Sequence, residues 1–242
     1  MSKRTAPEWL TQWEYAHRGL HGHGVPENSL KGAQLAIEAG LGIECDVQRS
    51  ADNKAVIFHD WDTKRLIGTD GDTGALKAAE LKQMRYLSGD QSVATLKDLL
   101  NLIDTQVPLL IEIKSKPGYD IAASCEAVAA DLAEYEGKHA VMSFDARVAR
   151  WFRRNSPSTC VGLVMREDEY GYTQTAWQRR MAYWIALPDF IAYHIAALPN
   201  RWIERLRKKG LPILSWTVNS PETRTRALAR ADALISEGAG LA

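Results

Sequence analysis

Residues 41–60 read LGIECDVQRSADNKAVIFHD, and this stretch decides how the strands of the chain can be arranged. Two apolar runs, 41–48 and 55–59, have the composition of buried strands. Only about six residues separate them, whereas a crossover between parallel strands needs a dozen or more. The two runs are therefore predicted to form an antiparallel hairpin whose turn lies at 49–54.

Along the rest of the chain, short apolar runs alternate with stretches of helical periodicity, which is typical of parallel strands joined by helices. Strands are predicted at 15–18, 41–48, 55–59, 108–114, 139–143, 160–164, 190–193, 211–218 and 233–236. Helices are predicted at 28–39, 75–85, 96–104, 119–135, 146–154, 175–186, 200–209 and 221–229. Since the hairpin accounts for one of these nine strands, the other eight can all run parallel.

Eight parallel strands that alternate with helices predict an α/β protein with a TIM-type (β/α)8 barrel. The length of 242 residues suits one such barrel, and no linker or low-complexity tract divides the chain. We therefore expect a single domain over residues 1–242, with a small insertion at 61–93 that follows the strand ending in His59-Asp60.

The composition limits the partners and the compartment. Lys and Arg total 30 and Asp and Glu total 30, so the net charge gives no support for a nucleic-acid partner or for stable membrane association. The cysteines lack Cys-x-x-Cys spacing, which argues against a zinc site or a disulfide scaffold and fits a reducing compartment. Neither a signal-type apolar segment nor a run of the ~18 apolar residues that span a bilayer is apparent. We expect a cytoplasmic protein, and a homo-oligomer is compatible with the sequence.

Two carboxylates lie in the first strand of the hairpin. Side chains alternate along a strand, so Glu44 and Asp46 share one face while the apolar residues around them share the other. In a barrel strand the apolar face packs on the helices, which places both acids in the interior. Two like charges there are costly unless a cation neutralises them.

The strand predicted at 108–114 repeats this pattern, with Glu112 and Lys114 on the inward face. Together with Glu44 and Asp46, Glu112 offers only oxygen ligands, which suit Mg²⁺ or Ca²⁺ better than zinc. The alternative is a structural ion pair between Glu112 and Lys114, with the other acids solvated. Two such strands in one barrel favour a metal site, because charges are seldom buried unpaired.

Two histidines stand at the ends of predicted strands. His17 ends the first strand, and the hairpin register brings His59 close to Cys45. Histidine accepts and donates protons near neutral pH. Arg18 could hold a phosphate oxygen bidentately, and Lys114 could supply a second positive charge. A divalent ion, two cations and two histidines are the parts of a site for phosphoryl transfer.

Short motifs follow one another in a specific order along nearly the whole chain. They are His17-Arg18-Gly19, Pro26-Glu27-Asn28-Ser29, Glu44-x-Asp46-Val47, His59-Asp60, Glu112-Ile113-Lys114 and Trp216-Thr217-Val218-Asn219, with Arg65, Glu80-Leu81 and Thr95-Leu96 in the intervening region. This ordered set closely resembles the glycerophosphodiester phosphodiesterase family. The sequence departs from the family pattern at Ser29, where Thr is usual, at Ala94, where Pro is common, and at Ser236-Glu237, where Thr-Asp is common.

The resemblance implies a TIM-type barrel, one divalent cation and a set of roles for residues of this chain. The implied metal ligands are Glu44, Asp46 and Glu112, the general acid and base are His17 and His59, and the phosphate ligands are Arg18 and Lys114, with Glu27 at the edge of the site. Trp216 ends a strand, where an aromatic ring either packs on the glycerol backbone of a substrate or fills the core.

The implied reaction is metal-dependent hydrolysis of a small-molecule glycerophosphodiester to sn-glycerol 3-phosphate and an alcohol. One alternative is activity of the lysophospholipase D type on lysolipids, which needs an apolar groove for the acyl chain. The insertion is mostly polar, so small soluble diesters are favoured. A second alternative is a barrel that binds a phosphorylated ligand without catalysis, and the intact set of acid, base and metal ligands argues against it.

A further apolar pattern lies in the helix predicted at 175–186. Trp177, Met181, Trp184 and Ile185 recur at helical spacing. Such a stripe is typical of core packing, so we expect these side chains to be buried.

Overall fold

The computed structural model describes residues 5–241, and the contacts within it divide the chain into two compact units. The first unit is Ala16–Lys138, and the second unit joins Met1–Tyr15 to His139–Ala242. Strand β1 (Tyr15–Ala16) lies where the sequence passes from the second unit into the first.

The strands of the first unit are β2 (Gly42–Arg49), β3 (Ala55–Ile57), β4 (Ala94–Thr95) and β5 (Leu109–Ile113). β2 pairs in parallel with β5 and antiparallel with β3, with Gln48 opposite Val56. The predicted hairpin is therefore confirmed. β4 pairs antiparallel with β3 and was not predicted, because a strand of two residues has no readable alternation.

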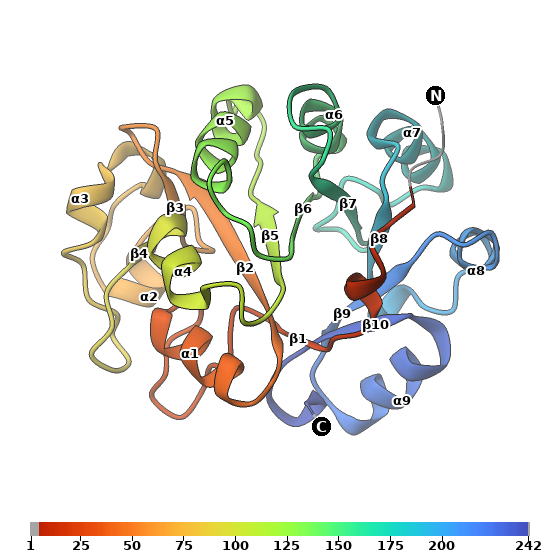
Figure 1. The fold of residues 1–242 in the computed structure, drawn as a ribbon, viewed down its shortest axis with the longest axis horizontal. Coiled ribbons are helices and arrows are strands. Elements are labelled where there is room, and N and C mark those ends of the chain that lie inside the picture. The colour runs from red at the N-terminus through yellow and green to blue at the C-terminus, as the bar shows by residue number, and fades with distance from the viewer. Residues whose placement is uncertain (1–4, 242) are drawn as a thin grey trace. The chain divides into compact units, whose positions relative to one another are not determined.

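Three helices of the first unit pack against these strands (Figure 1). They are α1 (Leu30–Glu38), α4 (Leu96–Ile103) and α5 (Ile121–Leu132). α1 begins at Ser29, whose Oγ accepts a hydrogen bond from the Gly32 amide at 3.1 Å and donates one to the Pro26 carbonyl at 2.7 Å. This cap fixes where the chain leaves the loop that follows β1 and enters the helix.

The segment between β3 and β4 carries only short elements. They are α2 (Lys64–Ile67), the 3-10 turn η2 (Thr73–Ala75) and α3 (Ala78–Leu81). The helix predicted at 75–85 is therefore wrong in extent. The chain after α3 pairs with its own return, where the Tyr86 amide donates to the Gln91 carbonyl and the Val93 amide to the Met84 carbonyl. Apolar residues of the segment pack on β3 in a cluster of Val56, Phe58, Ile67, Ala78, Leu81, Tyr86 and Val93.

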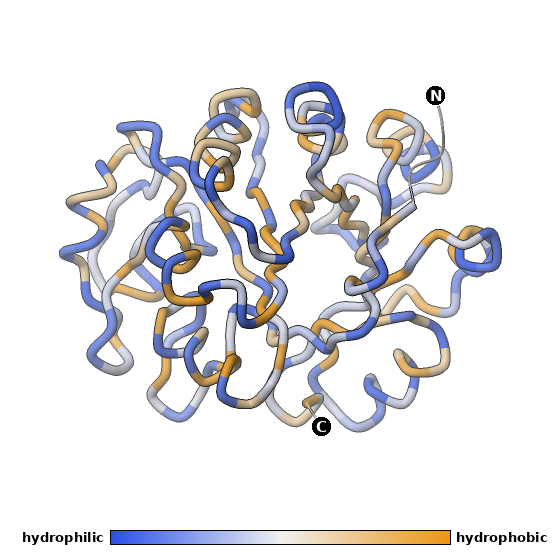
Figure 2. Tube along the Cα trace, viewed as in Figure 1, coloured by the Kyte–Doolittle hydropathy of each residue, from blue (hydrophilic) through white to orange (hydrophobic). Residues whose placement is uncertain are grey.

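The second unit is a run of parallel strands joined by helices. Its strands are β6 (His139–Ser143), β7 (Cys160–Met165), β8 (Phe190–His194), β9 (Ile213–Val218) and β10 (Ala233–Ser236), each paired with the next. The connecting helices are α6 (Ala146–Asn155), α7 (Ala176–Ala186), α8 (Arg201–Lys208) and α9 (Pro221–Arg230). Short 3-10 turns are η1 (Glu8–Thr11), η3 (Ile195–Ala197) and η4 (Gly238–Gly240). Figure 2 shows apolar strands and largely polar α6 and α8, as expected when helices cover a buried sheet.

The burial predicted for the stripe on α7 is wrong. Trp177, Met181 and Trp184 are 60%, 50% and 75% exposed. The helix instead buries Arg179, whose guanidinium donates to the carbonyls of Thr173 and Gln174. The buried residues of α7, Arg179 and Ala186, thus lie on the face opposite its apolar stripe.

Within the part of the chain that the structure describes, no helix has both the length and the apolar character needed to cross a bilayer. The single domain over residues 1–242 and the cytoplasmic location stay predictions.

The contribution of the Ser29 cap to stability can be tested by mutation. Ser29→Ala removes the oxygen that accepts from the Gly32 amide, so we expect the free energy of unfolding to fall by about 1–2 kcal/mol in urea titrations. Ser88→Ala is the matched control, because Ser88 is exposed, and it should change stability by less than about 0.5 kcal/mol. Equal effects of the two substitutions would show that the cap does not hold the helix.

Candidate active site

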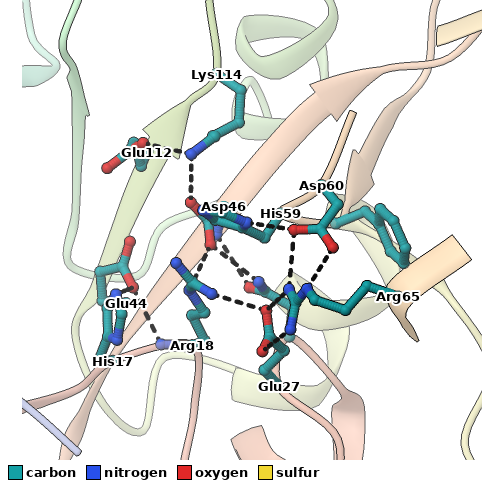
Figure 3. A network of polar contacts seen from close by, with 12 residues as sticks. His17, Arg18, Glu27, Glu44, Asp46, His59, Asp60, Arg65, Glu112 and Lys114 are labelled. Atoms are coloured by element: carbon teal, nitrogen blue, oxygen red, sulfur yellow. Dashed lines mark hydrogen bonds and ion pairs between the residues drawn. The ribbon is translucent and has the colours of Figure 1, made fainter. Parts of the chain in front are cut away.

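Three carboxylates of the first unit meet on the paired strands β2 and β5 (Figure 3). The ladder places Asp46 directly opposite Glu112, and Glu44 precedes Asp46 by two residues on the same face. The side chains of all three are buried. One oxygen from each lies within 4.8 Å of those of the other two. The inward face predicted for these acids therefore brings them into one cluster.

Two cations compensate part of this negative charge. Lys114 Nζ lies 3.1 Å from Glu112 Oε1 and 3.3 Å from Asp46 Oδ1, and Arg18 Nε lies 3.1 Å from Asp46 Oδ2. Burial opposes the ionisation of Asp46, but the charges of Lys114 and Arg18 outweigh it and hold the pKa of that carboxyl well below its usual range.

Glu44 is in a different electrostatic position. Burial, followed by the charges of Asp46 and Glu112, raises the pKa of Glu44 well above its usual range. Its Oε2 accepts a hydrogen bond from the backbone amide of Arg18 at 3.0 Å, which offsets only part of this cost. Ionising all three carboxylates at once would therefore create more negative charge than Lys114 and Arg18 neutralise.

Arg18 is held in place by an unusual loop conformation. Its φ is +58°, and its carbonyl accepts a hydrogen bond from the Asn28 amide at 2.9 Å. The next residue, Gly19, has φ +76°, and a Cβ there would lie 2.9 Å from the backbone carbon of Gly32. Only glycine fits this approach to α1 without strain. Although Arg18 Nε is close to Asp46, it is not aligned for a hydrogen bond, so this buried donor has no hydrogen-bond partner.

Asn28 is a site residue to which the sequence assigned no role. Its carboxamide Nδ2 donates to Asp46 Oδ2 at 3.0 Å, and its Oδ1 accepts from the Asp46 amide at 3.0 Å. The residue is buried and has φ +54°. This pair of hydrogen bonds fixes the orientation of the Asp46 carboxylate. The only sequence signal for it was the place of Asn28 in the motif before α1.

Glu27 joins the cluster to the segment after β3. Its Oε1 accepts from Arg18 at 2.8 Å and from Arg65 Nη2 at 2.8 Å, and its Oε2 accepts from Arg65 Nη1 at 3.0 Å. Burial opposes ionisation, but the hydrogen bonds and charges of the two arginines leave the pKa of Glu27 below its usual value. Both oxygens are thus occupied by arginine, and Glu27 positions Arg18.

His59 and Asp60 follow β3 and are tied to β2. Gln48 Nε2 donates to the carbonyl of Phe58 at 3.1 Å and to that of Asp60 at 2.5 Å. The His59 Nδ1 lies 2.7 Å from Asp60 Oδ1, and Arg65 holds the same carboxylate through Nε and Nη2. With Nδ1 donating to Asp60, Nε2 is the ring nitrogen left to exchange a proton with a ligand.

His17 lies on the other side of the carboxylates, with its Nε2 4.0 Å from Glu44 Oε2. The first unit thus brings together His17, Arg18, Glu27, Glu44, Asp46, His59, Glu112 and Lys114 (Figure 3). Trp216 belongs to β9 of the second unit, where its indole Nε1 donates to the Ala192 carbonyl at 3.1 Å and its ring packs on Phe144 and His194. Its contact with a substrate stays a prediction.

Residues 17–238 match the glycerophosphoryl diester phosphodiesterase family. The chain belongs to this family. A Bacillus subtilis protein that carries the name of a glycerophosphodiester phosphodiesterase, YhdW, is 26% identical to it over 87% of this chain and 88% of its own length. The family assignment makes the chain an enzyme that hydrolyses phosphoric diesters, as the sequence predicted.

Solved structures of other proteins show the fold. A phosphodiesterase from Oleispira antarctica in complex with the product sn-glycerol-3-phosphate has a TM-score of 0.81 at 23% identity, over 93% of this chain and 92% of its own. A glycerophosphodiester phosphodiesterase from Thermotoga maritima has a TM-score of 0.74 at 27% identity, over 92% of both chains. The predicted fold class is confirmed as a TIM-type (β/α)8 barrel, to which β3 and β4 add two strands.

The family implies a divalent metal, and the residues of the cluster fit one. Glu44, Asp46 and Glu112 present oxygen donors only, as hard divalent cations prefer. The raised pKa of Glu44 marks negative charge for which a cation would compensate.

The contribution of Lys114 to stability can be measured by removing its ion pairs. Lys114→Met leaves Asp46 and Glu112 buried without their shared cation, so we expect the free energy of unfolding at pH 7 to fall by roughly 3–5 kcal/mol. Lys64→Met is the control, because the Lys64–Asp70 pair is 70% and 80% exposed and should contribute less than about 1 kcal/mol.

The difference in unfolding free energy between the wild type and Lys114→Met should depend on pH in a definite direction. Lys114 lowers the pKa of Asp46 in the folded protein, so its stabilisation is present above the unfolded pKa of about 4 and is lost as the pH falls through the folded pKa. In the variant the carboxyls protonate at higher pH, so the gap in stability should narrow from pH 7 to pH 4. A gap of constant size over this range would contradict the electrostatic origin.

Proposed function

We propose that the chain hydrolyses small glycerophosphodiesters to sn-glycerol 3-phosphate and an alcohol, with the help of Mg²⁺ or Ca²⁺. The observation that carries this proposal is the buried cluster of three carboxylates with Lys114 and Arg18 beside it, because it combines ligands for a hard cation with donors for a phosphate. The Oleispira antarctica phosphodiesterase, solved with sn-glycerol-3-phosphate, supports the identity of the product.

Glu44, Asp46 and Glu112 would hold the divalent ion. When bound, the ion supplies positive charge that polarises phosphate oxygens and makes a nearby hydroxyl more acidic. The two hydrogen bonds between Asn28 and Asp46 keep the Asp46 carboxylate oriented before any ligand arrives. Such preorganisation reduces the cost of assembling the site.

Lys114 and Arg18 are suited to bind the phosphate. An ammonium has three N–H donors, and pairing with Glu112 and Asp46 leaves one for a phosphate oxygen. Arg18 has a buried Nε without a hydrogen-bond partner, which is an expensive arrangement unless a ligand accepts from it. Fixed donors of this kind stabilise the charge that develops on phosphoryl oxygens in the transition state.

His17 and His59 provide the proton transfers. Hydrolysis removes one proton from the attacking hydroxyl and delivers one to the oxygen of the departing alcohol, so one base and one acid suffice. Asp60 fixes the orientation of the His59 ring through Nδ1. The same pair serves attack by water and attack by the substrate's own glycerol hydroxyl.

The direct test is the release of glycerol 3-phosphate from a panel of glycerophosphodiesters and lysolipids by the purified protein. Soluble diesters should be hydrolysed in preference to lysolipids, because the exposed residues of the 61–93 segment are largely charged. Turnover of lysolipids alone would replace the proposed substrate class, and no turnover of either would overturn the proposed function.

Metal dependence is expected to be complete. Protein stripped with EDTA should lose activity and regain it with Mg²⁺ or Ca²⁺, because the three carboxylates are the proposed ligands. Glu112→Gln should weaken reactivation by the metal, whereas Glu126→Gln, an exposed position on α5, should not. Full turnover by stripped protein in excess EDTA would exclude the metal from the reaction.

The roles of the two histidines should be distinguishable by the acidity of the leaving alcohol. His17→Ala and His59→Ala are each expected to lower kcat by about 10²–10⁴-fold, because each removes one proton transfer. A nitrophenol departs without needing a proton. A substrate that releases one should therefore partly restore the activity of only the variant that lacks the general acid. Circular dichroism checks that both variants are folded. Near-normal activity of either folded variant would remove that histidine from the proposed mechanism.

A further inference from the structure

A cation and two aromatic rings form a cluster beside the proposed site, in the first unit. Lys116 Nζ lies 4.5 Å from the centroid of the Trp61 ring and 5.8 Å from that of Tyr119. The two rings meet edge to face, with centroids 5.3 Å apart. Trp61, Lys116 and Tyr119 are each partly exposed, so a ligand can reach them. We call these three residues the Trp61 platform.

Hydrogen bonds to the backbone hold the Trp61 platform in place. The Tyr119 hydroxyl donates to the Arg49 carbonyl at 3.3 Å, which ties the loop after β5 to the end of β2. The Thr73 amide donates to the Trp61 carbonyl at 3.0 Å, and the Thr73 hydroxyl donates to the Asp60 carbonyl at 3.0 Å. The rings are thus anchored to the same strand and segment that position Asp46 and His59.

The Trp61 platform continues directly from the residues proposed for catalysis. Lys116 follows Lys114 by two residues, which is roughly 7 Å along an extended chain. Trp61 follows His59 by two residues, in the segment that comes after β3. If Lys114 holds the phosphate of a diester, these short stretches of chain allow one of its two substituents to reach this cluster.

The charge of the Trp61 platform determines which substituent it accepts. Open aromatic faces bind quaternary ammonium groups, but here the protein's own ammonium occupies the face of Trp61. The acid paired with Lys116 is Asp72, at 3.8 Å and with 57% of its side chain exposed, so this pair is weak. Lys116 therefore repels a second cation and attracts an anion.

We propose that the Trp61 platform is the subsite for the leaving alcohol, and that it selects alcohols bearing an anionic group, such as a carboxylate, over alcohols bearing a quaternary ammonium. The inference rests on the proposed function, because it concerns the alcohol half of the same diester. Trp61 contacts the apolar part of the alcohol and packs against Lys116. The charge of Lys116 discriminates between anionic and cationic alcohols.

The experiment compares three glycerophosphodiesters whose leaving alcohols carry a carboxylate, a hydroxyl or a trimethylammonium group on linkers of equal length. The ratio of kcat/KM for the carboxylate ester to that for the trimethylammonium ester is measured in the wild type and in variants. Comparing ratios cancels the different reactivity of the alcohols. Lys116→Met should lower the wild-type ratio by about tenfold, and Lys116→Glu should lower it further.

Three further measurements separate this subsite from a general effect of charge. Lys54→Met removes an exposed lysine from the β2–β3 turn of the same unit and should leave the ratio unchanged. Trp61→Leu should lower the ratio as well, because Lys116 then loses the aromatic ring against which it packs. In 1 M NaCl, where charges are screened beyond about 3 Å, the wild-type ratio should fall toward that of Lys116→Met.

The outcomes are distinguishable. If the wild type hydrolyses all three esters and Lys116→Met leaves the ratio unchanged, the subsite is wrong and the proposed function stands. A ratio lowered equally by Lys54→Met and Lys116→Met would also overturn the subsite. If the wild type hydrolyses none of the three esters with metal present, the proposed function itself fails.

Discussion

The mutual repulsion of three buried carboxylates is the constraint on which the rest of the site depends. Glu44, Asp46 and Glu112 cannot all be ionised in a dry interior unless positive charge lies close to them. Lys114 directly follows the strand that carries Glu112, so its position follows from the alternation of side chains. Arg18 comes from a loop, and a left-handed backbone, a close-fitting glycine and Glu27 are all used to hold it.

The arginines extend this electrostatic order beyond the cluster. Arg18 contacts Asp46 and Glu27, and Arg65 contacts Glu27 and Asp60. Asp60 in turn orients His59. Alternating charges therefore run without interruption from the cluster to His59, so two arginines link the position of this ring to the carboxylate of Asp46.

Residues whose placement follows from strand geometry could be predicted from the sequence. The short turn between β2 and β3 indicated the hairpin, and period-two alternation indicated the inward acids and Lys114. Placements that depend on tertiary contacts could not be predicted in this way. Asn28 adopts a left-handed conformation to reach Asp46, and Arg65 spans to Glu27 across 38 positions of sequence.

The same distinction explains the errors in the fold. The helix predicted at 75–85 ends early because its chain pairs with its own return, and β4 exists only because β3 offers it an edge. The stripe on α7 had the right periodicity for burial, but the buried face of this helix carries Arg179, which donates hydrogen bonds to the backbone just before the helix. Local patterns identify elements, whereas their limits and orientations depend on partners distant in sequence.

The pairing of β3 with β4 determines which part of this enzyme is free to vary. Because Ile57 faces Ala94 across the ladder, the segment between them leaves and re-enters the unit at one place. The entropic cost of closing such a loop rises by only about 0.6 kcal/mol for each doubling of the loop length. Changes of length are therefore tolerated best at the exposed turn 87–90, because His59, Asp60 and Arg65 in the same segment are tied to the site and other residues of the segment pack on β3. Insertions and deletions can accumulate at that turn while the residues around the carboxylate cluster stay in place.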